Sequence, residues 1–226
     1  MKKPILILLC FSFIFSCIEE EVESKDPDNE IIIQTSNIVD TIYSDGTHYI
    51  GELENNQKTG KGNCTYTNGN KYIGEFKNNL ANGQGTYIGL NGDSYIGQWV
   101  NNKPNGHGIY TWGDGPHYGD VYEGKFKDGD PHGRGVYTWG DGPNKGDVYE
   151  GEFVNNKKTG NGICTYANGE IYVGEWKDGK SHGQGKFTTT DGKILEGLFE
   201  NGEYIDSNNE SNLDSEDVIN NEDIIK

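Results

Sequence analysis

Basic residues are scarce in this 226-residue chain: 19 Lys and Arg stand against 36 Asp and Glu, which gives a formal net charge of −17. Most of the acidic excess lies near the two ends, in residues 18–42 and 205–226, and the stretch between them carries a net charge of only −6. Phosphate backbones and anionic lipid surfaces are bound through basic patches. The composition therefore argues against nucleic acid as a partner and against electrostatic adhesion to lipid.

Long hydrophobic runs are also missing. The longest, from Ile5 to Phe15, has 11 residues, whereas a helix needs about 20 to cross a bilayer. This run follows Lys2 and Lys3 and precedes the small residue Ser16, a pattern typical of a cleavable export signal. We expect residues 1–16 to be removed on export.

The residues at 14–17, Ile-Phe-Ser-Cys, resemble the lipobox of bacterial lipoproteins, in which cleavage before the cysteine exposes the residue that receives lipid. The resemblance implies lipidation of Cys17, and several acyl chains would anchor the protein stably. Residues 17–42 are then the lipidated cysteine and an acidic, solvated tether. The expected location is the bacterial envelope, with the outer membrane favoured and its face undecided. The alternative is an ordinary secretory signal in which Cys17 is incidental.

The rest of the chain is repetitive. A Tyr-x-Gly-x-aromatic segment begins at Tyr49 and recurs six times at intervals of 23 or 27 residues, with Leu195 in place of Tyr in the seventh copy. A Gly-x-Gly segment follows in register from Gly60 to Gly183. All 34 glycines, 14 tyrosines and four tryptophans lie within residues 43–204. Two markers that keep one period identify residues 43–204 as a repeat array.

Within each copy, aromatic residues and glycine alternate with other residues, the period of two that indicates a half-buried strand. Pairs such as Asn78-Asn79 suit tight hairpin turns, and Asn-Gly or Asp-Gly pairs lead to the next copy. The glycine in each strand is explained if an aromatic ring lies against its bare backbone. We predict an all-β fold: an elongated, single-sheet antiparallel meander of about seven hairpin repeats, with one aromatic face and one mainly polar face. Residues 205–226 are predicted to be disordered or to form a short capping helix.

These motifs resemble the MORN (membrane occupation and recognition nexus) repeat, whose pattern is Tyr-x-Gly-x-aromatic, a turn, His-Gly-x-Gly, and then Tyr or Phe. Departures are the incomplete seventh copy and the two 27-residue copies. The resemblance implies a twisted sheet of consecutive hairpins that acts as a scaffold for partner proteins or sits at membranes. In some members of the family, the aromatic groove receives an extended peptide.

Residues for catalysis are not apparent. The Gly-x-Gly segments lead into strands and lack the Lys-Ser/Thr of a phosphate loop, and no serine has a visible base. Cys64 and Cys164 hold the same place four repeats apart, about 38 Å by strand spacing, which is too far for a disulfide. We predict no enzymatic activity, no cofactor and no disulfide between these cysteines.

The leading hypothesis is a lipid-anchored, non-catalytic scaffold that binds a partner protein or an extended peptide. The candidate contact residues are large aromatic side chains, although these rings can equally serve only to hold the sheet. They are Trp99, Trp112, Trp139, Trp176, Tyr110 and Tyr137. One alternative is a module that recognises lipid or a membrane surface.

A second alternative is a Ca²⁺-stabilised adhesion or structural protein. The two four-residue insertions contain carboxylates that could offer oxygen ligands to Ca²⁺. These residues are Asp114, Asp120, Asp141 and Asp147. Because Asp-Gly pairs also form turns unaided, the turn interpretation is preferred and no metal site is predicted.

Overall fold

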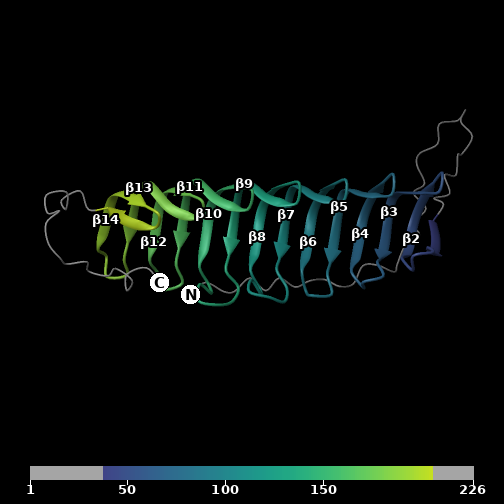
Figure 1. The fold of residues 1–226 in the computed structure, drawn as a ribbon, viewed down its shortest axis with the longest axis horizontal. Coiled ribbons are helices and arrows are strands. Elements are labelled where there is room, and N and C mark those ends of the chain that lie inside the picture. Colours follow the sequence, from purple (N-terminus) through teal and green to yellow (C-terminus); the bar gives the residue numbers. More distant parts are fainter. Residues whose placement is uncertain (1–37, 206–226) are drawn as a thin grey trace, which may run out of the picture. The chain divides into compact units, whose positions relative to one another are not determined.

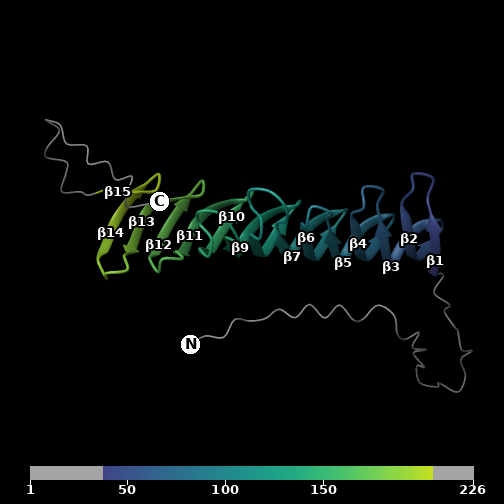
Figure 2. The same cartoon turned by 90° about the horizontal axis from the view of Figure 1, so that it is seen from below.

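The computed structural model describes residues 38–205; Cys17, the predicted signal and the C-terminal tail lie outside them. Fifteen antiparallel strands form one sheet in chain order, so each strand pairs with the strands before and after it. Figure 1 shows consecutive strands side by side in a single row, and Figure 2 shows the same row turned by 90°. Residues 38–205 contain no helix. The predicted all-β, single-sheet meander is confirmed.

Most hairpins join a seven-residue strand to a nine-residue strand. The bounds are β1 (Ile38–Ile42), β2 (His48–Glu54), β3 (Gln57–Thr65), β4 (Lys71–Lys77), β5 (Leu80–Ile88), β6 (Ser94–Val100), β7 (Lys103–Thr111), β8 (Val121–Lys127), β9 (Asp130–Thr138), β10 (Val148–Val154), β11 (Lys157–Thr165), β12 (Ile171–Lys177), β13 (Lys180–Thr188), β14 (Ile194–Glu200) and β15 (Glu203–Ile205).

The sheet begins earlier than the predicted start of the array at residue 43. Strand β1 falls within the stretch assigned to the tether, and it pairs with β2 along its whole length. Val39 packs against the buried core, and the Asp40 carboxylate lies 2.6 Å from Nε2 of His48. Burial alternates along β1, so Val39 and Thr41 are partly buried while their neighbours are exposed, as in a strand with one face on the core. The boundary is therefore corrected to residue 38.

The hairpin turns form as predicted. Asn78 and Asn79 both have positive φ, at 51° and 69°, and the Asn or Asp that opens each of the other six hairpins is also positive. Left-handed residues of this kind match the twist of the strands that they join. Cys64 and Cys164 are buried free thiols, in agreement with the prediction of no disulfide.

A register shift follows the strand glycine in most repeats. In the β4–β5 hairpin, Gly74 faces Gly85, but the next aligned pair is Phe76 with Ala81. Glu75 lies at this irregularity, and its carboxylate accepts a hydrogen bond of 3.1 Å from the backbone N–H of Gln84. Glu52, Gln98 and Glu175 make the equivalent bond in their own repeats. In these four repeats, the polar residue after the glycine thus satisfies a backbone donor that the bulge leaves unpaired.

Candidate functional site: the aromatic face

Each of the six repeats that begin with tyrosine lays that ring over two glycines. A Cβ atom built on Gly108 would lie 2.4 Å from Oη of Tyr95, and one built on Gly97 would lie 2.6 Å from it. The Tyr95 hydroxyl donates a 2.9 Å hydrogen bond to the backbone carbonyl of Gln98. The same bond recurs in six repeats. The predicted steric reason for glycine, room for a ring against bare backbone, is confirmed.

In the five repeats from Tyr72 to Tyr172, the aromatic residue four positions after the tyrosine stands edge-on between two tyrosine rings. The Trp99 ring centroid lies 5.1 Å from those of Tyr95 and of Tyr72 in the preceding repeat, with interplanar angles of 85° and 84°. Similar pairs continue from Tyr49 to Phe199, and we call these buried rings the inner row. Edge-to-face pairs add to the stability that ring burial gives. The inner row therefore joins every repeat to the next.

Two of the predicted contact residues belong to the inner row. Trp99 and Trp176 are only 7% and 6% exposed. The Nε1–H groups of these residues donate to the backbone carbonyls of Gly85 and Gly162, at 3.1 and 3.3 Å. These two indoles hold the sheet and are not accessible to a partner.

The other four predicted residues lie together in one exposed-edge cluster, which we call the outer cluster: Tyr110, Trp112, Tyr137 and Trp139. Neighbouring ring centroids are 4.6 Å apart for Tyr110 and Trp112, 5.4 Å for Trp112 and Tyr137, and 4.6 Å for Tyr137 and Trp139. All four rings are partly exposed. Among residues 38–205, neither Trp112 nor Trp139 has a hydrogen-bond acceptor for its indole N–H. The cluster therefore offers ring surface and two donors to a ligand.

Carboxylates in the loops between repeats position the outer cluster. Each accepts the backbone N–H of a residue in the following loop: Asp93 from Gly113 at 2.7 Å, Asp120 from Gly140 at 2.8 Å, and Asp147 from Ala167 at 2.8 Å. Asp120 is 1% exposed and also accepts from the Tyr137 hydroxyl. Desolvation raises the pKa of Asp93, but hydrogen bonds from Gly113 and Asn91 outweigh it and lower this pKa overall. These links fix each loop against the next.

The four candidate Ca²⁺ ligands are accordingly divided. Asp120 and Asp147 are buried and bonded to backbone, whereas Asp114 and Asp141 are exposed. Within the described part of the chain, no group of three His, Cys, Asp or Glu side chains is arranged to hold a metal ion. The Asp-Gly segments serve as turns.

A cavity of about 440 Å³ opens on the aromatic face between the inner row and the neighbouring aromatic side chains of strands β5 and β7. We call it the central cavity. Its lining includes Tyr66, Tyr72, Ala81, Tyr87, Trp99 and Tyr110. Tyr110 joins it to the outer cluster, so the two form one continuous aromatic surface. Sequence reasoning missed the cavity because it arises where small residues, Ala81 and Pro104, replace longer side chains.

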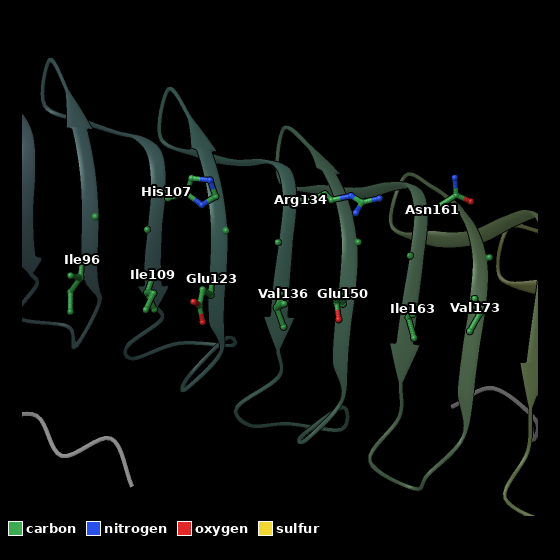
Figure 3. Close-up of a pocket in the computed structure, with 17 residues that line it drawn as sticks. Ile96, His107, Ile109, Glu123, Arg134, Val136, Glu150, Asn161, Ile163 and Val173 are labelled. Carbon is green, nitrogen blue, oxygen red and sulfur yellow. The ribbon is translucent and has the colours of Figure 1, made fainter. Parts of the chain in front are cut away.

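The opposite face carries a second groove, of about 780 Å³, with glycine backbone along its floor. Figure 3 shows Ile109, Val136 and Ile163 on one side of the glycines and His107 and Arg134 on the other. Several aliphatic side chains here are well exposed, including Ile96 at 48% and Val173 at 46%. The prediction of a mainly polar face was wrong at this point. It relied on the residue after the glycine of the first strand in each repeat. The residue before that glycine is often Ile or Val, and the residue after the last glycine of Gly-x-Gly is Ile or Val in three repeats.

Comparison with known proteins identifies the repeat. Six segments match the family model described as MORN repeat, at residues 49–71, 72–94, 95–116, 122–143, 149–171 and 172–194. The incomplete seventh copy, which begins at Leu195, lies outside these matches. No helix among the described residues is long and apolar enough to cross a membrane. A search of curated proteins found no match.

Two solved structures show distant likeness. The TCP domain of SAS-4 from Drosophila melanogaster, in complex with a proline-rich motif of Ana2, is 12% identical, with 78% of this chain and 98% of that chain covered and a TM-score of 0.38. A streptogramin B lyase is also 12% identical, with 76% and 72% covered and a TM-score of 0.18. Both scores are too low to transfer a fold or a function. The six matched segments make up more than half of the sequence, and the chain belongs to the MORN repeat family, as a β-hairpin repeat array of the scaffold or binding-module type.

Proposed function

We propose that this protein is a membrane-tethered, non-catalytic scaffold that binds an extended segment of a partner protein on its aromatic face. The observation that carries the proposal is the outer cluster, in which Trp112 and Trp139 are partly exposed. The buried core is already formed by the inner row. Tyr and Trp lose little entropy on binding and dominate protein interfaces. Two indole donors one repeat apart would bond backbone carbonyls of a ligand.

Rigidity supports this role. The inner row and the loop carboxylates hold the outer cluster before any partner arrives, so association needs little ordering of the scaffold. The partner is a protein or peptide of the same compartment. The net charge of −17 disfavours nucleic acid.

The test compares capture of envelope proteins by the full chain and by two double variants. Trp112→Ala with Trp139→Ala removes the two tryptophans of the outer cluster, and Ile109→Ala with Ile163→Ala removes two exposed side chains from the opposite groove. We expect a partner that is retained by wild type and by the Ile variant but lost from the Trp variant. Equal capture by all three, or loss only from the Ile variant, would contradict the proposed surface.

Tethering through lipid on Cys17 is the second part of the proposal, and it rests on the lipobox-like sequence at residues 14–17. Replacement Cys17→Ser should release the chain from the membrane fraction, whereas the wild-type chain should stay with it. Liposome binding by the purified Cys17→Ser chain tests direct lipid recognition. Strong binding that weakens with salt would favour that alternative over protein binding.

A further inference from the structure

The two tryptophans of the outer cluster occupy the same position in neighbouring repeats. In each, the backbone N–H donates to the carbonyl of the buried aspartate that closes the insertion: Trp112 to Asp120 and Trp139 to Asp147, both at 3.0 Å. Each tryptophan directly follows the second strand of its hairpin, β7 or β9, and these strands are two places apart in the sheet (Figure 1). At about 4.8 Å per strand, one repeat advances about 9.6 Å along the sheet.

The ring distances agree with this spacing. The centroid of Tyr137 lies 5.4 Å from that of Trp112 and 4.6 Å from that of Trp139, so the two indole rings lie within about 10 Å of each other. Nζ of Lys158 lies 4.9 Å from the Trp139 centroid and covers one face of that ring. The indole N–H groups of both tryptophans have no acceptor within residues 38–205. A ligand that bonds to both must therefore carry acceptors about 9.6 Å apart.

A column of tyrosine rings keeps the same interval. Tyr87, Tyr110 and Tyr137 lie on β5, β7 and β9, and each pairs with the tyrosine that opens the next repeat. All three rings are partly exposed. The Tyr87 hydroxyl accepts a 2.6 Å hydrogen bond from Nδ2 of Asn70, and the Tyr137 hydroxyl donates to the Asp120 carboxylate. These bonds fix the two rings before any ligand arrives.

The column of partly exposed tyrosines is limited to three repeats. At the equivalent position, the repeats on either side have Cys64 and Cys164, which are buried and carry no ring. Three ring positions at intervals of about 9.6 Å span about 19 Å. A ligand that contacts all three rings therefore crosses the strands from β5 to β9.

The interval distinguishes between backbone conformations of such a ligand. A polyproline II helix rises about 3.1 Å per residue with three residues per turn, so equivalent carbonyls recur about every 9.3 Å. In a β-strand, carbonyls on one side recur about every 6.7 Å. In an α-helix, most carbonyls are already bonded within the helix. Of these three conformations, only polyproline II has free carbonyls at the interval of this sheet.

We propose that Tyr87 and the outer cluster bind a polyproline II segment of the partner, about two to three turns long, that lies across β5, β7 and β9. This inference rests on the proposed function and names the conformation of the bound segment. Carbonyls one turn apart accept hydrogen bonds from Trp112 and Trp139, and proline rings pack against the tyrosines of successive hairpins. Proline-rich segments hold this conformation before binding, so they lose little entropy.

The test titrates acetyl-nonaproline amide, a helix of about three turns, into the full chain and follows the indole N–H signals of the tryptophans by NMR. Its control has the same composition, but the central residue is D-proline, which breaks the left-handed helix. We expect the signals of Trp112 and Trp139 to shift and those of Trp99 and Trp176 to stay. The control should bind more weakly by about tenfold or more. Absence of nonaproline binding, or equal binding of the control, would overturn the proposal.

Variants separate the indole donors from the ring surface. Trp112→Phe with Trp139→Phe keeps two aromatic rings but removes both N–H groups, and it should weaken nonaproline binding by about tenfold. Ile163→Ala with Val173→Ala shortens two exposed side chains of the opposite groove and should leave the affinity unchanged. Circular dichroism checks that both variants keep the sheet. Unchanged affinity of the folded Phe variant, or an equal loss in the groove variant, would contradict the proposed contact.

Failure of the proposed function gives a different result. If nonaproline binds at the indoles but capture of no envelope protein depends on Trp112 and Trp139, the polyproline II site stands and the scaffold function is wrong. If a captured partner depends on those tryptophans and nonaproline does not displace it, the scaffold function stands and the polyproline II conformation is wrong.

Discussion

Two sets of aromatic rings run along the same face of this sheet, yet they do different work. In the inner row, Trp99 is almost fully buried, and its indole N–H is bonded to the backbone. In the outer cluster, Trp112 is partly exposed and depends on a loop that Asp93 holds through Gly113. The comparison teaches that one row of rings is fully buried in the core, whereas the second set packs against that core and stays partly exposed.

Alkaline pH should have the largest effect, because it acts on the inner row in every repeat at once. Burial raises the pKa of Tyr95 and of Tyr122 from 10 to about 12. The folded state then holds these protons more tightly than the unfolded state, so their stabilising contribution is full below pH 10 and is lost as pH rises through 12. Tyrosinate absorbance and circular dichroism should change together in that window. Ionisation near pH 10 with the sheet intact would show that the inner row is open to solvent.

Replacing one tryptophan from each set tests the comparison directly. Trp99→Ala should lower the free energy of unfolding by about 3–5 kcal/mol, because it empties the inner row between two tyrosines. Trp112→Ala should cost less than about half of that, because its ring is only partly buried. Urea unfolding of both variants measures the difference. Similar losses for the two would mean that the outer cluster is also core.

Packing of the inner row should also be disturbed when a glycine beneath its tyrosine rings is replaced. Gly108→Ala places a methyl group against the ring of Tyr95 and should cost about 1–3 kcal/mol, as overpacking of a core does. In a Tyr95→Ala background the same change should cost much less, because the ring that it meets is gone. A double-mutant cycle on unfolding free energies checks this. Additive effects would show that the glycine is required for another reason.

The outer cluster has its own support, and Asp120 is its buried member. Asp120→Ala leaves the Gly140 N–H and the Tyr137 hydroxyl without this acceptor, and it should cost about 1–3 kcal/mol. Asp114→Ala, in the same insertion but exposed, should have almost no effect on unfolding. The Asp120 variant should also weaken capture of a partner, because the loop that carries Trp139 is no longer fixed.

Much of the fold was predictable because every copy of the repeat carries the same sequence signals. The period of two, the paired turn residues and the glycine beside every tyrosine all pointed to one sheet of hairpins. Strand β1 was missed because Ile38–Ile42 carries no glycine or aromatic marker of the repeat. It forms a strand only because the first hairpin offers an open edge for pairing.

The candidate site was only partly predictable, since a type of residue does not reveal its exposure. Trp99 and Trp112 are both tryptophans of an aromatic face, and only packing separates the core ring from the accessible one. The surroundings of two lysines were hidden for a similar reason, because Nζ of Lys58 and Nζ of Lys158 each lie over three aromatic rings. Lys58 and Lys158 resemble ordinary polar residues of a strand until their neighbours, Cys64 and Cys164, are seen to leave room for them.

Calcium should have the smallest effect on the melting temperature. An unchanged melting temperature would distinguish the outer cluster from a loop that depends on a bound metal. Asp120 and Asp147 already accept backbone hydrogen bonds, so Ca²⁺ would have to break those bonds before it gained any ligand from them. Asp114 and Asp141 alone supply too few oxygens. The melting temperature in millimolar Ca²⁺ should therefore equal that in chelator. A ligand that binds only the folded state must raise the melting temperature. A clear increase would therefore mean that the loops rearrange around the ion. The outer cluster would then be positioned by the metal and not by its carboxylates.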